Sequence, residues 1–227
     1  MHSYIEGIAT IFKANANTER AAWSKAYMLH QFEFYGLVTA QRRKLSKTYM
    51  QNNPLTSLNE IKVIVKECFN LPEREFQYFA IELMHFNKKL WQPSIIRTIE
   101  YCLTKKSWWD SVDHIASECL TDYFKLYPNK IIPITSKWSQ SNNIWLQRSS
   151  ILFQKAFKAK TNTELLSKYI LQCSNSKEFF IQKAIGWALR EYSKTNAEWV
   201  KKFVAIHSLP ALSKREALKR ITDLVYQ

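Results

Sequence analysis

The chain has 227 residues, a formal net charge of +14 at pH 7 and 46% hydrophobic residues. This length and apolar content allow one large domain or two small ones, with a buried core. Only three glycines occur beside six prolines, whereas sheet proteins need turn residues in quantity, so the composition favours helices joined by short polar loops. Three glycines could hardly build a phosphate-cradling loop, which excludes nucleotide hydrolysis and dinucleotide chemistry.

The predicted elements are helical from one end of the chain to the other. Helices with aromatic starts recur every 33 to 36 residues, near Phe76, Trp109, Trp145, Phe180 and, more weakly, Arg215. Further helices are predicted between them, at residues 92–103, 123–127 and 163–173. A period of about 35 residues with two helices per repeat is typical of a helical solenoid, in which inner helices line a concave groove. Because no long linker interrupts the pattern, we predict an all-α fold with a single domain over residues 1–227.

The positive charge is concentrated toward the C-terminus. Residues 137–227 contain 16 Lys and Arg against 6 Asp and Glu, whereas residues 1–136 contain 17 against 13. A concentrated positive field favours a polyanionic partner, most often nucleic acid. The alternative is a soluble protein that merely has a high isoelectric point. No apolar run reaches about 18 residues, so we expect no membrane span.

The cysteines and histidines give no pattern of metal ligands. The four cysteines are scattered without a C-x-x-C pair, which predicts buried, reduced thiols. The five histidines have no metal-ligand spacing with Cys or Glu. We therefore expect neither a metal nor a cofactor.

Trp109 and Asp113 are four residues apart, so their side chains meet on one helix face. That face is rotated by about 100° from the core line of Trp108 and Val112. An indole and a carboxylate both attract cations, which indicates a site for a positive species. The alternative for Asp113 is a helix-start charge favoured by the helix dipole, a role that suits Asp110 better.

Trp187 lies about 200° around its helix from the core residue Ile185, so it should point away from the core. Its own face carries three basic residues, Lys183, Arg190 and Lys194. Such a Trp could pack on a sugar or base while the cations hold phosphates. The alternative is that it packs against a neighbouring repeat, with the basic residues as a solvated rim.

Two other charged residues lie in helices of mostly apolar and aromatic residues. Arg148 has no acidic residue three or four positions away, so we expect it to be unpaired and free to hold a phosphate. For Glu82 we expect a structural hydrogen bond.

Four segments carry a resemblance to the bacterial AlkD-type DNA alkylation repair family: Tyr78-Phe79-Ala80-Ile81-Glu82-Leu83, Trp108-Trp109-Asp110-Ser111-Val112-Asp113, Ile144-Trp145-Leu146-Gln147-Arg148-Ser149 and Lys183-Ala184-Ile185-Gly186-Trp187-Ala188-Leu189-Arg190-Glu191-Tyr192. They occur in order through nearly the whole chain. The resemblance implies a HEAT-like solenoid that binds duplex DNA in its concave groove. It also implies a glycosylase that releases 3-methyladenine and 7-methylguanine without the base flipping usual for glycosylases.

The resemblance also implies roles for single residues. Trp109 and Trp187 would contact the deoxyribose of the lesion, Asp113 would be the catalytic carboxylate and Arg148 would contact the DNA backbone. We add four basic residues as candidates for DNA binding: Lys183, Arg190, Lys194 and Arg43. Of these, Arg43 belongs to a segment whose match to the family is less specific. The implied protein is a monomer that acts on alkylated double-stranded DNA in the bacterial cytoplasm, at the nucleoid when bound.

Two other functions stay open on the sequence. One is a non-catalytic binder of branched or distorted DNA on the same scaffold, which the positive charge would serve equally well. The other is a helical-repeat module for an acidic protein or peptide. A pure binder, however, has no need of a carboxylate in a DNA groove, where it repels phosphates.

Overall fold

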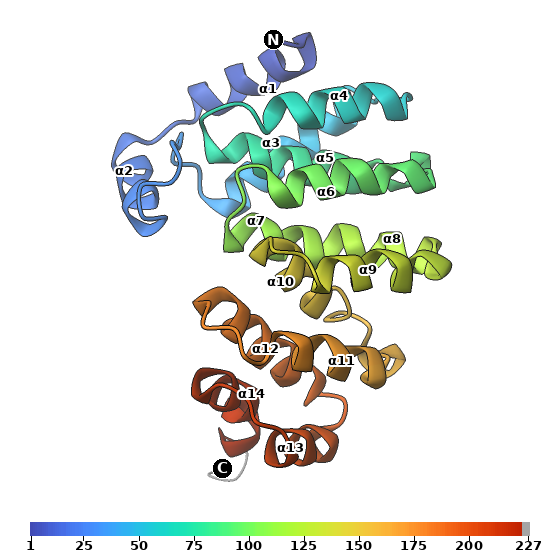
Figure 1. The fold of residues 1–227 in the computed structure, drawn as a ribbon. Helices are drawn as coiled ribbons and strands as arrows, with labels where there is room; N and C mark the ends of the chain where they lie inside the picture. Colours follow the sequence, from blue (N-terminus) through green and yellow to red (C-terminus); the bar gives the residue numbers. More distant parts are fainter. Residues whose placement is uncertain (224–227) are drawn as a thin grey trace. The chain divides into compact units, whose positions relative to one another are not determined.

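The computed structural model describes residues 1–223 and has an all-α architecture, as predicted (Figure 1). Among these residues the only β pairing is an isolated bridge between Glu33 and Glu73. The close contacts divide the chain into two compact units, which comprise residues 1–106 and residues 107 onward. The expectation of a single domain over 1–227, with one concave groove, stays a prediction.

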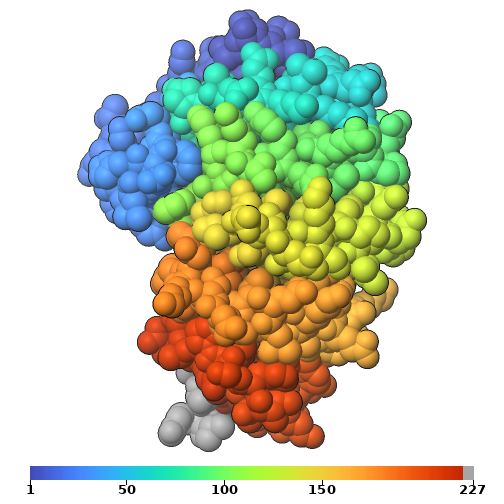
Figure 2. All heavy atoms as spheres, in the orientation of Figure 1, coloured from blue at the N-terminus to red at the C-terminus, as the bar shows by residue number. Residues whose placement is uncertain are grey.

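The first unit contains helices α1 (Ser3–Ala14), α2 (Thr18–Tyr27), α3 (Thr39–Asn52), α4 (Leu58–Cys68), α5 (Arg74–Phe86) and α6 (Ile96–Thr104). Helix α5 lies in its core, where Phe79 and Leu83 are fully buried, and α4 packs against α5 and α6. Helix α2 contributes no buried residue, and the chain around it forms a lobe at the edge of this unit (Figure 2).

Glu82 of α5 makes the structural hydrogen bonds predicted for it. Its carboxylate accepts two hydrogen bonds from the guanidinium of Arg42, at 2.7 and 2.9 Å, and Arg42 is only 4% exposed. The neighbouring Arg43 also pairs with Glu82, at 3.3 Å, but its side chain is 53% exposed.

The second unit contains α7 (Trp109–His114), α8 (Thr121–Leu126), α9 (Ile131–Ser139), α10 (Ile144–Leu152), α11 (Thr163–Cys173), α12 (Phe179–Tyr192), α13 (Ala197–Ile206) and α14 (Ala211–Asp223). A π-helical segment, Ile115–Leu120, joins α7 to α8. Helices α5, α7, α10 and α12 begin at Arg74, Trp109, Ile144 and Phe179, which are spaced at 35 residues. The predicted helical repeat is therefore confirmed.

All four cysteines are buried and free, as predicted. In the part of the chain that the structure describes, no helix is both long and apolar enough to cross a membrane. The same residues contain no group of three or more His, Cys, Asp or Glu side chains that could hold a metal ion.

Candidate active site

Three consecutive repeats of the second unit build the candidate site. Helix α10 packs between α7 and α12, with contacts to both. Its start is set by Asn143, whose side chain accepts hydrogen bonds from the backbone N–H groups of Trp145 and Leu146. Because α7 and α10 start 35 residues apart, Asp113 and Arg148 occupy the same position in their helices.

Asp113 and Arg148 form a bidentate pair between α7 and α10. Nε and Nη2 of Arg148 each donate to one carboxylate oxygen of Asp113, both at 2.8 Å. Nη1 donates to the backbone oxygen of Phe180, at the beginning of α12. The Arg148 side chain is 1% exposed and that of Asp113 is 16% exposed. The carboxylate is thus held in one orientation and remains partly open to solvent.

The expectation that Arg148 is unpaired is wrong. It considered only residues one helical turn away, whereas the acidic partner lies 35 residues away on another helix. The guanidinium binds a carboxylate and a backbone carbonyl here, so a contact between Arg148 and a DNA phosphate stays a prediction.

Trp187 of α12 lies among three cations. The centroid of its ring is 5.3 Å from the guanidinium carbon of Arg148, 5.7 Å from the ammonium of Lys155 and 5.9 Å from the guanidinium carbon of Arg190. The indole is half-buried. Both readings of the sequence therefore hold in part, because Trp187 packs on Arg148 of the preceding repeat and also lies within a basic surface.

The two adjacent tryptophans differ in their packing. Trp108 precedes α7, and its ring contacts those of Trp145 and Phe180, at 5.9 and 5.1 Å between centroids. Trp109 is the first residue of α7, is partly exposed, and lies one turn before Asp113. Trp108 thus joins the repeats, while the contact of Trp109 with the carboxylate of Asp113 stays a prediction of their spacing.

A further acidic residue next to Trp187, Glu216 of α14, was missed by the sequence analysis. Its carboxylate accepts hydrogen bonds from Lys183 at 2.8 Å and from Arg190 at 3.0 Å. The pKa of Glu216 is lowered, chiefly by the hydrogen bond from Lys183, with smaller contributions from the two positive charges and a hydrogen bond from Trp187 that together outweigh the effect of burial. Glu216 therefore anchors the basic residues that flank Trp187.

Gly186 of α12 allows Glu216 of α14 to approach the backbone of α12 closely. A Cβ at this position would lie 2.4 Å from the Cβ of Glu216 and 3.0 Å from the backbone oxygen of Ser213. A glycine inside a helix usually marks such a close approach, so it was the available signal in the sequence.

The basic residues predicted to bind DNA all have acidic partners. Lys183 and Arg190 pair with Glu216, Lys194 just after α12 pairs with Glu191 near the end of that helix, and Arg43 pairs with Glu82 in the first unit. The acidic partners offset the positive charge of these residues, whose side chains remain partly exposed. Their contacts with DNA stay predictions.

The fold and the site together define an all-α helical-repeat protein with a basic, aromatic surface around an Arg–Asp pair. A model of the DNA alkylation repair enzyme family matches residues 8–221, and the chain belongs to this family. A solved structure described as a predicted DNA alkylation repair enzyme from Enterococcus faecalis is 35% identical to it. That similarity covers 90% of this chain and 95% of the other, with a TM-score of 0.84. A search of curated proteins found no match. The resemblance read from the sequence is thereby confirmed at the level of the family, which places the protein in the repair of alkylated DNA.

Proposed function

We propose that the protein is a DNA glycosylase that hydrolyses the N-glycosidic bond of positively charged alkylated purines in duplex DNA. The proposed substrates are 3-methyladenine and 7-methylguanine, released without base flipping. The observation that carries this proposal is the carboxylate of Asp113, which Arg148 holds in a fixed orientation while its guanidinium packs on the indole of Trp187.

Charge stabilisation accounts for the proposed catalysis. Alkylation places a positive charge on the base and makes it a good leaving group, and cleavage then develops oxocarbenium character on the sugar. A carboxylate about 4 Å from that cation contributes about 4 kcal/mol at an effective dielectric constant of about 20. This corresponds to a rate factor of roughly 10³. The faces of Trp109 and Trp187 would add cation–π attraction to the same charge.

Asp113 and Arg148 have different roles in this proposal. Asp113 is the catalytic residue, which stabilises the sugar cation and positions the attacking water. Arg148 is a positioning residue that acts through Asp113, since its donors fix both carboxylate oxygens. No cofactor takes part, because the lesion itself supplies the positive charge.

The test is release of methylated base from a duplex that contains 7-methylguanine. The wild type should release the base, and Asp113→Asn should lower the single-turnover rate by roughly 10³. A duplex with an uncharged lesion should be a poor substrate. If the wild type releases no more base than buffer, the protein is not a glycosylase. If Asp113→Asn keeps the full rate, the catalytic carboxylate is another residue.

The paired state of Asp113 also favours a second candidate, a non-catalytic binder of branched or distorted DNA. In such a protein the ion pair with Arg148 would only join α7 to α10. Tight binding to a four-way junction, with no base release from any alkylated duplex, would support this candidate over the first. Monomeric state and a bacterial cytoplasmic location stay predictions for either.

A further inference from the structure

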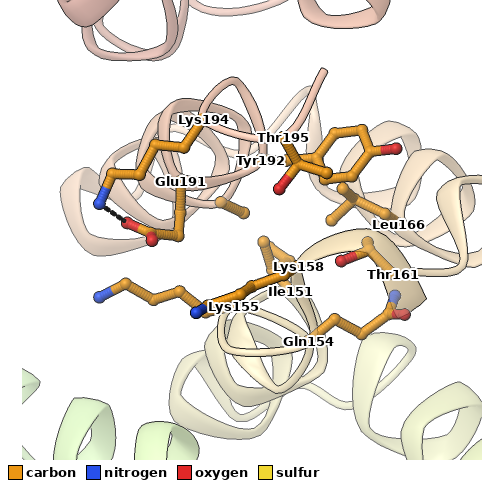
Figure 3. A pocket seen from close by; sticks show the side chains of 11 residues that line it. Ile151, Gln154, Lys155, Lys158, Thr161, Leu166, Glu191, Tyr192, Lys194 and Thr195 are labelled. Carbon is orange, nitrogen blue, oxygen red and sulfur yellow. Dashed lines mark hydrogen bonds and ion pairs between the residues drawn. The ribbon is translucent and has the colours of Figure 1, made fainter. Parts of the chain in front are cut away.

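A pocket of about 310 Å³ opens in the second unit between α10, α11 and α12 (Figure 3). Its apolar lining consists of Ile151, Leu166 and Ala188, one from each helix. Gln154 and Tyr192 lie on one side of it, opposite the hydrogen-bonded pair of Lys194 and Glu191 (Figure 3). The pocket is therefore a concave site with an apolar floor and polar walls.

Three lysines line this pocket, and only one of them is neutralised. Lys194 pairs with Glu191 at 2.6 Å. Lys155 lies in the turn that follows α10, and Lys158 begins the short 3-10 helix after it. Within the described residues neither has a carboxylate at ion-pair distance. The pocket thus carries two uncompensated positive charges, which attract an anion.

The backbone at Lys158 is held in a conformation that lysine rarely adopts. Its φ angle is +52°, in the left-handed region where glycine and asparagine are preferred. Strained residues of this kind are often found at ligand sites.

Lys155 links the pocket to the candidate active site. Its ammonium is 5.7 Å from the centroid of the Trp187 ring. Lys155 is also one of the residues that line the pocket. A group held in the pocket would therefore be a direct neighbour of the surface where the lesion's sugar is proposed to lie. In DNA the neighbours of a sugar are its phosphates.

We propose that this pocket binds a backbone phosphate of the substrate DNA strand, with Lys155 and Lys158 as its charged ligands. The inference rests on the proposed function, because it assigns the pocket to the same DNA. Thr161 and Tyr192 also line the pocket. A free mononucleotide offers the same phosphate chemistry, and the experiment separates the two sources.

The first measurement is the salt dependence of binding to an undamaged duplex. Each lysine that neutralises a phosphate contributes about 1 to the slope of log Kd against log salt concentration. The double variant Lys155→Gln/Lys158→Gln should therefore lower the slope by about 2. The matched control is Lys201→Gln/Lys202→Gln, which removes the same charge from exposed positions on α13 and should leave the slope unchanged. A wild-type slope in the pocket variant, or an equal fall in the control, would overturn the proposal.

A second variant separates binding from folding. Lys158→Asn suits the left-handed backbone, so its midpoint of urea unfolding should equal or exceed that of the wild type. Its salt slope should nevertheless fall by about 1. An unchanged slope in this folded variant counts against Lys158 as a phosphate ligand.

The source of the phosphate is tested with deoxyadenosine monophosphate and inorganic phosphate as probes. Neither should compete with DNA below millimolar concentration. Micromolar binding of the mononucleotide that is lost in Lys155→Gln/Lys158→Gln, with an unchanged DNA slope, would assign the pocket to a free nucleotide and overturn the proposal.

These measurements need no catalysis, so they are independent of the test for glycosylase activity. A reduced slope in a protein that releases no methylated base would support the phosphate site and refute the proposed function. Normal base release with an unreduced slope would refute the phosphate site alone.

Discussion

The ion pair between Asp113 and Arg148 makes a prediction that separates stability from catalysis. Asp113→Asn leaves a guanidinium that is only 1% exposed without its carboxylate. Removal of one partner from a buried pair costs about 3–5 kcal/mol. Asp113 is itself 16% exposed, and the amide oxygen of Asn still accepts one hydrogen bond. We therefore expect the lower end, about 3 kcal/mol.

A double variant should recover this stability but not the activity. Arg148→Met, combined with Asp113→Leu, replaces both charged side chains with apolar ones and leaves the Met to pack on Trp187. Replacement of a buried pair by packed apolar groups is often neutral or stabilising. We expect most of the lost free energy of unfolding to return, while base release stays at the level of Asp113→Asn because no carboxylate is restored.

Urea unfolding followed by tryptophan fluorescence is a suitable assay, since six of the eight tryptophans lie in the second unit. The control is Ile170→Ala, which empties a fully buried position on α11 of the same unit, away from the pair. It should lose about 2–5 kcal/mol and keep wild-type base release per folded molecule.

Two results would refute this reasoning. If the free energy of unfolding of Asp113→Asn lies within about 0.5 kcal/mol of the wild-type value, the ion pair does not stabilise the fold as its geometry indicates. If the double variant regains base release, the carboxylate of Asp113 is not the catalyst.

Two further predictions concern the contact between α12 and α14. Glu216→Gln should lower stability at neutral pH. The folded protein holds the pKa of Glu216 below its ordinary value of 4.5. The difference in stability between Glu216→Gln and the wild type should therefore be largest above pH 4.5 and should shrink as the pH falls below it. Urea midpoints measured across this pH range test the prediction, and a stability difference independent of pH would contradict it. Gly186→Ala should destabilise by about 1–3 kcal/mol, because its Cβ would overlap Glu216. A gain of about 1 kcal/mol, usual for this change in an open helix, would show that α14 does not approach so closely.

The helices and their repeat could be predicted from the sequence because they depend on local periodicity. The aromatic starts near Trp109, Trp145 and Phe180 agree with the observed starts within one residue. The same periodicity placed Val112 on the core face of its helix, where it is fully buried, whereas Trp108 lies before the helix and packs between repeats. These assignments need only the angle of about 100° between successive helical residues.

The partners of the charged residues could not be predicted in this way. Arg148, Lys183 and Arg190 all bind carboxylates on other helices, 35, 33 and 26 residues away. A rule that considers only residues three or four positions apart cannot find such partners. The pocket near Lys158 was also missed, since it is lined partly by the turn and short 3-10 helix after α10, which have no periodic pattern.

The sequence by itself determined the helical repeat, the family resemblance and the one-turn spacing of Trp109 and Asp113, because all three are properties of residues near each other in the chain. Only the tertiary structure decided that Arg148 is a buried partner of Asp113, that Glu216 anchors the surroundings of Trp187 and that two lysines remain uncompensated. The physical reason is that the stacking of helices brings together charges from distant parts of the chain, and Coulomb attraction depends on their separation in space.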